Sequence, residues 1–342
     1  TGAKPAISAY PEWEWWADAW LGRNRHRLGQ VFLGPDWKFR RTDPNVLTLD
    51  RCRWRAGGGK LSEVTPLFRA QMDVRKKLGL RPNHDNGDVQ RWRWVHGPKE
   101  TKKAPTEYHF EFDVDVVPKG DVSLVIEGSE LYRIRLNGKN VPSRKTGWYL
   151  DHSMHKVSLP RLKVGKNTLV LACDTTTTMQ TEDCFIMGDF GVTPSREITT
   201  EPDILHAGDW AMQGYLHYAG GIVYEAEFDV TTKKPAAAVL KLGKFSAVVV
   251  AIRVNGELAG YIPWRSADGL DVAKFLKPGR NRVEIEVMGS PRNMLGPLHH
   301  AAGKPAWTGA GQFLVTGPEY TPDYIVWPWG LMDQVSITLF GK

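Results

Sequence analysis

Aromatic side chains beside polar ones, in segments expected to be loops, are the residues whose chemistry is most readily interpreted. Trp264 is followed directly by Arg265, and Trp307 lies in a glycine-rich stretch. An indole can stack on the C–H groups of a pyranose, and a guanidinium or imidazole can hydrogen-bond its hydroxyl groups. Such residues therefore predict contacts with a sugar. The predicted contact residues are Trp148, Tyr215, His217, Tyr218, Trp264, Arg265, His299, His300 and Trp307.

Structural roles are the alternative for several members of this set. Trp148 and Trp264 occupy matching positions in two similar stretches, so each could instead cap a hydrophobic core. His299 and His300 are adjacent, and adjacent residues of a strand point to opposite faces, which disfavours a shared metal ion. Because the pair follows Gly-Pro-Leu, we expect loop residues that hydrogen-bond, with sugar hydroxyls as candidate partners.

Pairs of carboxylates were considered as catalytic groups. Hydrolysis of a glycosidic bond needs two carboxyl groups about 5–9 Å apart across a cleft. The candidate pairs are Glu127 with Glu130 and Glu182 with Asp183, but their close spacing and polar surroundings favour solvated surface residues. No catalytic residue is therefore assigned. Turn roles are expected for the aspartates of two Gly-Asp pairs, Asp189 and Asp209.

Metal and cofactor motifs are weak in this sequence. The stretch HDNGD at 84–88 groups oxygen ligands suited to Ca²⁺, but it lacks the later glutamate of an EF-hand loop, and a polar turn is favoured. Neither a P-loop nor a dinucleotide-binding glycine motif is present. Cys52, Cys173 and Cys184 have no metal-site spacing, and a single Cys173–Cys184 disulfide is left open. We predict no metal and no cofactor, with a structural Ca²⁺ as the alternative.

Charge and hydropathy limit the choice of partners. The chain has 342 residues, a formal net charge of +7 and an isoelectric point of about 9.2. RCRWR at 51–55 and QRWRW at 90–94 interleave arginine with tryptophan, as some nucleic-acid-binding surfaces do. In a strand, however, the arginines would face solvent and the aromatics the core. We therefore predict no nucleic-acid partner, with an acidic glycan along the arginine face as an alternative. No apolar run is long enough to cross a membrane.

Two stretches of the chain resemble each other over several blocks in the same order. YHFEFDVDV at 108–116 matches YEAEFDVTT at 224–232, and LKVGKNTLVLAC at 162–173 matches LKPGRNRVEIEV at 276–287. Between them lie two Asn-Gly hairpins, at Asn137 and Asn255. The constant order of these blocks predicts an internal duplication.

Each repeated unit predicts a β-sandwich. Alternating apolar residues indicate short strands with one buried face, and the Asn-Gly and glycine turns connect them antiparallel. The sequence therefore predicts an all-β protein of two tandem antiparallel β-sandwiches of the jelly-roll kind. We place the first in 28–200 and the second in 201–342.

Two segments outside the repeat are predicted to be helical. Residues 65–79 carry Thr65 as N-cap, Pro66 at the first helical position and Gly79 at the end, with Phe68, Met72 and Leu78 on the buried face. Residues 11–27 form a tryptophan-rich stripe that is expected to pack on a neighbouring surface, so 1–27 is treated as an N-terminal helical segment or linker. NVLTLDRCRWR at 45–55 and VQRWRWV at 89–95 are expected to be strands.

The segment VNGELAGYIPWRSADGLDVAKFLKPGRNRVEIEV at 254–287 resembles the galactose-binding-like jelly roll of glycoside hydrolases. With NVLTLDRCRW at 45–54, CFIMGDFGV at 184–192, GYLHYAGGIVYEAEF at 214–228 and RNMLGPLHH at 292–300, residues 30–342 resemble the C-terminal β-sandwiches of large bacterial glycoside hydrolases of the α-L-rhamnosidase type.

The resemblance implies an accessory role. In such enzymes a separate (α/β) barrel carries the catalytic carboxylates, and no pattern of eight alternating strands and helices occurs here. We therefore expect a non-catalytic region that binds an oligo- or polysaccharide or braces a catalytic domain. By resemblance alone, the location is extracellular or periplasmic. The alternatives are a structural or interaction module without sugar binding, and a complete glycosidase acting on plant or microbial polysaccharide.

Overall fold

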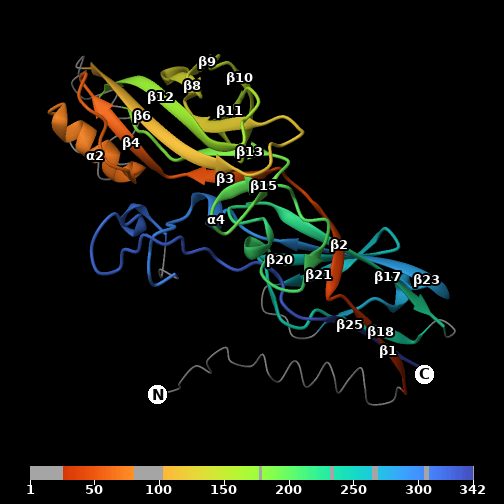
Figure 1. The fold of residues 1–342 in the computed structure, drawn as a ribbon. Coiled ribbons are helices and arrows are strands. Elements are labelled where there is room, and N and C mark those ends of the chain that lie inside the picture. The colour runs from red at the N-terminus through yellow and green to blue at the C-terminus, as the bar shows by residue number, and fades with distance from the viewer. Residues whose placement is uncertain are drawn as a thin grey trace, which may run out of the picture.

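The computed structural model describes residues 26–80, 103–176, 179–231, 235–263, 269–303 and 308–341. Strands dominate, and they form two packed β-sandwiches that lie end to end (Figure 1). The predicted all-β class is therefore confirmed. The predicted N-terminal helical segment, apart from its last two residues, and the strand at 89–95 lie outside the described residues.

The first sandwich packs a five-stranded sheet against an eight-stranded one. Its strands are β3 (Asn45–Leu49), β4 (Arg51–Ala56), β5 (Thr65–Pro66), β6 (Lys103–Val114), β7 (Ser123–Glu127), β8 (Arg133–Leu136), β9 (Lys139–Val141), β10 (Lys145–Tyr149), β11 (Asp151–Ser158), β12 (Gly165–Thr176), β13 (Cys184–Gly188), β14 (Gly191–Val192) and β15 (Glu197–Thr199). The smaller sheet has the order β10-β11-β7-β13-β3. The larger runs β14-β15-β6-β12-β8-β9, with β4 paired to β6 and β5.

The second sandwich packs a four-stranded sheet against a six-stranded one. Its strands are β1 (Arg27–Leu33), β2 (Asp36–Arg41), β16 (Leu205–His206), β17 (Gly221–Val230), β18 (Ala237–Lys241), β20 (Val249–Val254), β21 (Glu257–Pro263), β22 (Leu270–Asp271), β23 (Gly279–Met288) and β25 (Val335–Phe340), and a short ribbon adds β19 (Phe245–Ser246) and β24 (Gly330–Leu331). The sheet orders are β1-β25-β18-β22 and β16-β2-β17-β23-β20-β21.

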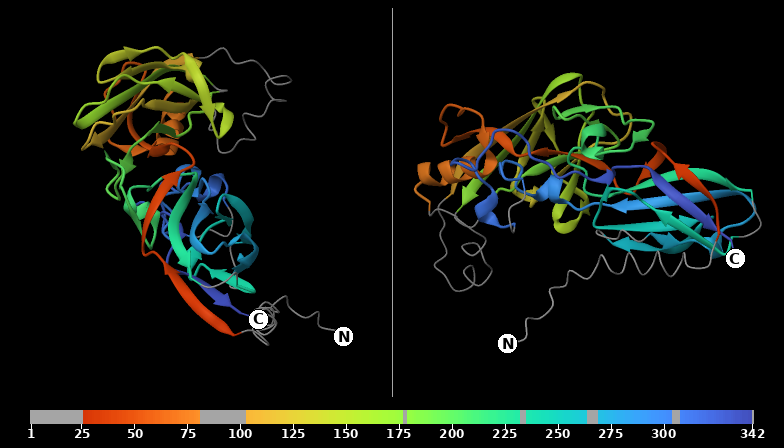
Figure 2. Two further views of the ribbon diagram at one scale, coloured as in Figure 1. Left: turned by 90° about the vertical axis from the view of Figure 1, so that its right-hand side faces the viewer. Right: turned by 90° about the horizontal axis from the view of Figure 1, so that it is seen from below.

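The path of the chain differs from a simple division at residue 200. β1 pairs antiparallel with β25, the last strand, and β2 pairs with β17. Figure 2 shows β1 and β25 side by side at the end of the second sandwich that is remote from the first. Residues 27–41 therefore complete the second sandwich, although we had placed 28–41 in the first. Nothing local marks this change, because an edge strand pairs with whatever partner the tertiary fold brings to it.

The two Asn-Gly hairpins form as predicted. Asn137 and Asn255 have φ of 51° and 53°, and each is followed by a glycine with positive φ, as the two-residue turn requires. The turn asparagine also donates from Nδ2 to Oδ1 of a buried second asparagine. This distance is 2.9 Å from Asn137 to Asn167 and 2.8 Å from Asn255 to Asn281.

The buried asparagine of each pair closes the glycine turn before the next strand. Asn167 Nδ2 donates to the carbonyls of Lys163 and Gly165 at 2.7 and 2.9 Å. Asn281 Nδ2 donates to Lys277 and Gly279, both at 2.8 Å. We call each arrangement an asparagine clasp, because one buried amide holds the hairpin and the turn together.

The helix predicted over 65–79 is present as α2 (Leu67–Lys77), but its start differs. Thr65 pairs with Cys52 in a short strand, and Pro66 takes the capping position without a side-chain hydrogen bond. The predicted face was also wrong in part, since α2 buries a different set of residues. These are Leu67, Ala70, Gln71, Val74 and Arg75. Short helical turns complete the chain: η2 (Ser129–Leu131), η3 (Trp210–Gln213), η4 (Ala273–Phe275), α4 (Arg292–Leu295) and η5 (Ala310–Gln312).

Strands β3, β7 and β13 of the five-stranded sheet are buried on both faces. The inner face of this sheet joins the core of the first sandwich. Val125, Phe185 and Met187 point outward and pack with Ala219 and Met294, which come from the second half of the chain. The two sandwiches are therefore joined by an apolar contact as well as by the chain itself.

Three buried cysteines lie within the first sandwich, and all are free thiols. The Cys173–Cys184 disulfide left open by the sequence is therefore not formed. Burial raises the pKa of all three thiols, which keeps them protonated and unreactive. Within the described ranges, no helix has both the length and the apolar character needed to span a membrane.

Candidate junction pocket

The main candidate site is an open pocket of about 630 Å³ where the chain passes between the sandwiches. Four separated segments supply its wall. Residues 39–44 connect β2 to β3, Asp189 follows β13, residues 201–203 follow β15, and Tyr215 comes after η3. Because these segments converge only when both sandwiches are formed, we call it the junction pocket.

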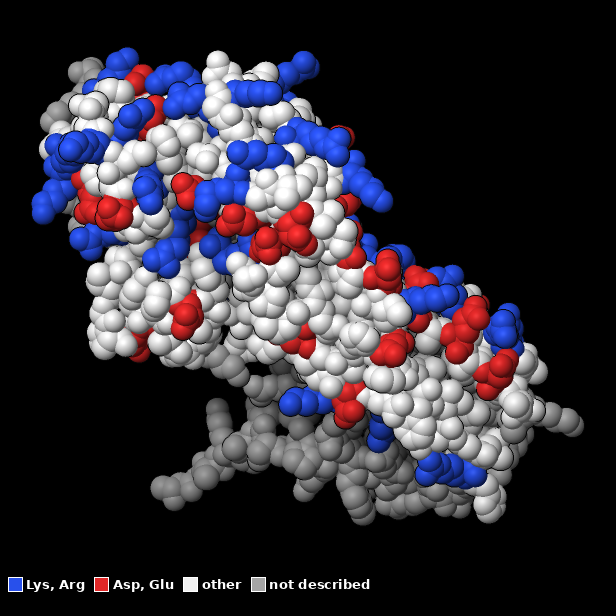
Figure 3. Space-filling model, viewed as in Figure 1, with Lys and Arg blue, Asp and Glu red and all other residues white. Residues whose placement is uncertain are grey.

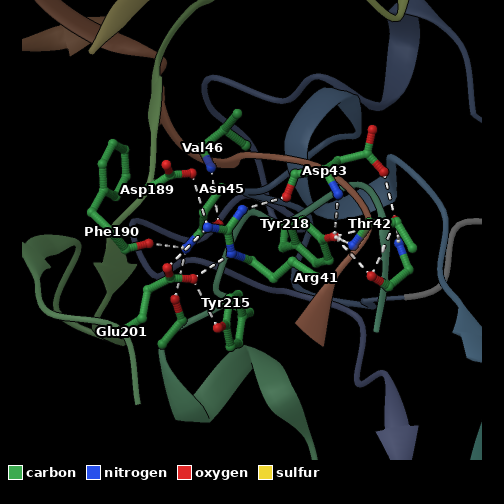
Figure 4. Close-up of polar contacts among 12 residues, drawn as sticks. Arg41, Thr42, Asp43, Asn45, Val46, Asp189, Phe190, Glu201, Tyr215 and Tyr218 are labelled. Atoms are coloured by element: carbon green, nitrogen blue, oxygen red, sulfur yellow. Dashed lines mark hydrogen bonds and ion pairs between the residues drawn. The ribbon is translucent and has the colours of Figure 1, made fainter. Parts of the chain in front are cut away.

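Arg41 lies at the centre of this wall (Figure 4). Its guanidinium donates to both carboxylate oxygens of Glu201, with Nη2 to Oε2 at 2.9 Å, and to Oδ1 of Asp189 at 3.0 Å. Nη1 donates to the Asp43 carbonyl at 2.6 Å. The planar fork of an arginine suits such a two-pronged contact and holds the side chain in one orientation.

Burial and charge act in opposite directions on these groups. Burial alone would lower the pKa of Arg41, but the hydrogen bonds to Glu201 and Asp189 outweigh it and raise the pKa above its ordinary value. Tyr215 donates its hydroxyl to Glu201 Oε1 at 3.0 Å. Its pKa is raised, first by burial and then by the Glu201 charge. Arg41 is therefore a fixed cation, and Tyr215 a fixed hydrogen-bond donor.

Two buried side chains hold the segment that follows Arg41. The Tyr218 hydroxyl accepts from the backbone N–H groups of Thr42 and Asp43 at 3.2 and 3.1 Å and donates to the Gly221 carbonyl at 2.8 Å. Asn45 Nδ2 donates to the carbonyls of Phe190 and Gly214 at 2.8 and 2.9 Å. The wall is thus fixed from both sandwiches, as Figure 4 shows.

The pocket offers both hydrogen-bond donors and acceptors. Its carboxylates are Asp43, Asp189, Glu201 and Asp203, and its cations are Arg40 and Arg41. Arg40 is also paired outside the pocket, with Glu225 and Glu284 at 3.4 Å. The excess of acidic groups favours a neutral or cationic ligand over an anionic one.

The same contacts do not suit glycosidic cleavage. A hydrolase needs one carboxyl group to donate a proton and another to attack or to activate water. Asp189 and Glu201 are both engaged by Arg41, which lies between them. Both carboxylates are therefore held as hydrogen-bond acceptors of Arg41.

A second polar cluster joins the first sandwich to the segment after β23. Asp50 accepts from Tyr324 Oη at 2.7 Å and from Arg196 Nη2 at 3.3 Å, and its Oδ2 lies 2.8 Å from His299 Nε2. The guanidinium of Arg196 also stacks on the Tyr324 ring at 4.0 Å. Burial would raise the pKa of Asp50, but these hydrogen bonds and charges outweigh it and lower the pKa.

Both ring nitrogens of His299 face acceptors. Nε2 faces Asp50, and Nδ1 lies 3.1 Å from the carbonyl oxygens of both Thr321 and Asp323. The buried contact between Asp50 and His299 therefore ties the two halves of the chain together.

The sequence-predicted contact residues fall into three groups. Tyr215 lines the junction pocket, while Tyr218 holds its wall from behind. His217 is buried and donates from Nδ1 to the Asn293 carbonyl at 2.9 Å, and His300 is buried with Nδ1 accepting from the Ala302 N–H at 3.3 Å. Trp148 is exposed, with 48% of its surface accessible. Trp264, Arg265 and Trp307 lie outside the described residues, as does the candidate Ca²⁺ loop at 84–88.

Most of the sequence-predicted carboxylates are surface or turn residues, but the prediction was wrong for Asp183, which is half-buried and whose pKa is raised, first by burial. Glu127 accepts from Ser153 Oγ at 3.2 Å, and Glu130 lies 3.3 Å from His155 Nδ1. Asp209 caps η3 and accepts from the Ala211 N–H at 2.8 Å, as expected for a turn residue. Among the described residues, no group of three or more His, Cys, Asp or Glu side chains could hold a metal ion.

Arg41 and Glu201 were missed by sequence reasoning. Asp189 was expected only as a turn residue, yet it reaches across to Arg41. Glu201 and Asp189 lie 160 and 148 residues from Arg41 in the sequence, and none of the three belongs to a local motif. No signal in the sequence alone could have found this cluster, because tertiary folding creates it.

The fold and the pocket define an all-β protein of two packed sandwiches with a polar site at their junction. No family model matches the sequence, and no curated protein matches it. Solved structures share a limited likeness. A rhamnosidase from Novosphingobium sp. PP1Y is 18% identical with a TM-score of 0.30, over 70% of this chain and 23% of that one.

Two further solved structures show the same level of likeness. A β-D-mannosidase from Dictyoglomus thermophilum is 11% identical with a TM-score of 0.26, over 75% of this chain and 32% of that one. A GH2 β-galacturonidase from Eisenbergiella tayi is 9% identical with a TM-score of 0.25, over 72% and 37%. This chain thus matches about a quarter to a third of each of these longer proteins, and at such scores the likeness does not establish its activity.

Proposed function

We propose that this chain is the accessory, non-catalytic β-sandwich region of a carbohydrate-active enzyme, and that it binds glycan in the junction pocket. The observation that carries the proposal is the fixed Arg41–Glu201–Tyr215 wall of a pocket of about 630 Å³. This size suits a small ligand or a chain end. Sugar hydroxyls both donate and accept hydrogen bonds, and the pocket lining offers carboxylates as acceptors and the Arg40 and Arg41 guanidinium groups as donors.

The absence of reorganisation supports binding at this site. Arg41 and Tyr215 are already oriented by Glu201, so a ligand would not have to order them. Asp203 is exposed on the rim, where it can accept from a hydroxyl without first breaking an internal contact. Trp264, Arg265 and Trp307 remain predicted contacts from the sequence.

The test is a titration of the full chain against neutral, amino-sugar and acidic polysaccharides. We expect saturable binding to a neutral or amino-sugar glycan, weakened about tenfold by Asp203→Asn, since one lost hydrogen bond to a charged group is worth about 1.5–3 kcal/mol. Glu257→Gln, which changes an exposed carboxylate on the β20–β21 hairpin, is the matched control. Binding that is equal in both variants, or hydrolysis of a glycan by the chain alone, would contradict the proposal.

A second candidate function, bracing of a catalytic domain, is favoured by the contacts between the sandwiches. The buried contact of Asp50 with His299 and the apolar contact of Phe185 with Met294 join the two sandwiches into one body. A failure of every glycan to bind, in a chain that unfolds in one cooperative transition, would favour this role over sugar binding.

A further inference from the structure

The edge of the first sandwich carries a concentration of positive charge. Residues 139–166 contain seven Lys or Arg residues and a single acidic residue, Asp151. Figure 3 shows Lys and Arg side chains crowded over the upper part of the first sandwich, where β8 to β11 lie, with few acidic ones among them. The seven are Lys139, Arg144, Lys145, Lys156, Arg161, Lys163 and Lys166. We call this region the basic edge.

Charges on the basic edge are poorly neutralised by the protein itself. Among the residues that the structure describes, Lys166 is the one member with a salt bridge, to Glu111 at 3.3 Å and Asp113 at 3.8 Å. The open face of the second sandwich differs. There Arg40 and Arg282 alternate with Glu225 and Glu284 in a cross-strand ladder of ion pairs. Unpaired like charges repel one another, and an anionic partner removes that repulsion.

An exposed tryptophan lies within the basic edge. Trp148 is on β10, the outermost strand of the five-stranded sheet, and 48% of its surface is accessible. The His152 ring lies 4.2 Å from the indole, centroid to centroid, so the hairpin supports the indole on that side. Lys145 Nζ in turn donates to the His152 carbonyl at 3.3 Å. The aromatic ring is therefore presented at the surface by its own hairpin rather than buried as a core cap.

Basic residues occur on both strands of the hairpin that carries this ring. Lys156 lies across from Gly147, and its Cδ is 3.7 Å from the position that a Cβ on this glycine would occupy. Thr146 Oγ1 donates to the Lys156 carbonyl at 3.1 Å, which fixes the pairing of the two strands. Lys145 and Lys156 thus come from the two strands of the hairpin that carries Trp148.

We propose that the basic edge is a binding surface for an acidic glycan, in which Trp148 stacks on a pyranose ring and the flanking lysines and arginines pair with its carboxylate or sulfate groups. This site is separate from the junction pocket, and it rests on the proposed function only in taking a glycan as the ligand. The two sites sort ligands by charge, because the pocket has an excess of carboxylates and the edge an excess of cations.

A single supported indole favours a glycan over single-stranded nucleic acid. Nucleic-acid grooves stack successive bases on successive aromatic rings. On this hairpin Trp148 is one ring, and one side of it is occupied by His152. One ring with cations around it fits one sugar unit of a charged polysaccharide.

The first experiment measures binding of the full chain to polygalacturonate, heparin, a neutral galactomannan and single-stranded DNA, each over a range of salt. We expect the acidic glycans to bind at low salt and to weaken as salt rises. Trp148→Ala should weaken polygalacturonate binding about tenfold or more, as expected for a central aromatic contact. Tyr261→Ala, at an exposed aromatic residue of the second sandwich, is the matched control and should change nothing.

A pair of charge variants separates a defined site from general attraction. Arg144→Gln with Lys145→Gln removes two charges from the basic edge, and Lys277→Gln with Arg280→Gln removes two from the glycine turn at the start of β23 in the second sandwich. Weaker binding and a shallower salt dependence in the first pair alone are expected. Equal losses in both pairs, full binding by Trp148→Ala, or a preference for DNA would overturn the proposal.

The two proposals can fail separately. Asp203→Asn should weaken neutral glycan binding and leave polygalacturonate binding unchanged, while Trp148→Ala should do the reverse. Binding of neutral glycan alone would remove the basic edge as a site and leave the proposed function standing.

Discussion

Some buried residues of this protein are ionisable, and the pH at which they take up a proton affects the free energy of unfolding. His217 is fully buried, and its Nδ1 donates to the Asn293 carbonyl, while Nε2 has no partner among the described residues. Burial lowers the pKa of His217 to about 4, and the nearby Arg196 charge acts in the same direction. His217 is therefore neutral in the folded protein at neutral pH.

This residue predicts a loss of stability in mild acid. The unfolded chain takes up a proton near the ordinary histidine pKa of about 6.5, whereas the folded chain does so only near 4, so stability falls as the pH drops between these values. From pH 7 to pH 5 we expect His217 to contribute a loss of about 2 kcal/mol. Urea unfolding at the two pH values measures it.

The comparison uses two variants. His217→Gln retains a donor for Asn293 and cannot be protonated, so it should reduce the pH dependence. His206→Gln, at a histidine whose side chain is 68% exposed, is the control. An identical pH dependence in His217→Gln and the unmodified chain would contradict this account.

The residue scale also shows where sequence reasoning fails. Aromatic residues chosen for their chemistry divided between burial, as for Tyr218, and exposure, as for Trp148. Tyr218 packs against Trp210 and Tyr215, whereas Trp148 lies on an edge strand, and this tertiary difference decides which ring is covered. The Arg41 site was not predictable, because its partners are brought together from distant segments.

At the scale of elements, local sequence signals correctly predicted two hairpins and one helix. The Asn-Gly pairs specified both hairpins, since few residues other than asparagine and glycine adopt positive φ without strain. Helix α2 was also predicted, but its first residue was not, because Thr65 is drawn into a strand by pairing with Cys52. Elements set by short-range chemistry were predictable, while boundaries set by tertiary pairing were not.

The asparagine clasps give a prediction at this scale. Asn281→Ala should cost about 3 kcal/mol, because it removes a buried amide that makes four hydrogen bonds, to Lys277, Gly279 and Asn255. Asn167→Ala should cost a similar amount in the first sandwich, where the same bonds are made. Denaturant unfolding of each variant measures the change in the free energy of unfolding.

An exposed asparagine of the first hairpin serves as the control. Asn140→Ala changes the same residue type on β9 without removing a clasp bond, and we expect a change within about 0.5 kcal/mol. A loss in Asn140→Ala as large as in Asn167→Ala would show that the clasp is not the source of the effect.

At the scale of the whole molecule, the sandwiches are not independent halves of the chain. In the second sandwich, β1 is an edge strand of the four-stranded sheet, and β2 is an inner strand of the six-stranded sheet. Without them, the edge of β25 and one edge of β17 would expose unpaired backbone groups and the core beneath. Trp37 on β2 would be lost from that core, where it is 1% exposed.

A truncation experiment follows from this topology. Residues 201–342 expressed alone should fail to fold or should aggregate. Addition of a peptide that covers residues 26–44 should restore the fold of the second sandwich. Amide NMR spectra and solubility report the outcome. A peptide of the same composition with Trp37 and Phe39 replaced by serine is the control, and a stable fold of 201–342 alone would contradict the assignment of β1 and β2.

The pairing of β1 with β25 also has a consequence for the order in which the chain folds. Arg27 lies opposite Phe340, so the first described strand to leave the ribosome meets its partner only after more than three hundred further residues have been made. The first sandwich, whose strands run from β3 to β15, can fold during this interval. Because contacts so distant in sequence form slowly, closure of the second sandwich is expected to be the last and slowest step of folding. Until then β1 and β2 are unpaired strands, and this is the period in which the newly made protein depends most on protection from aggregation.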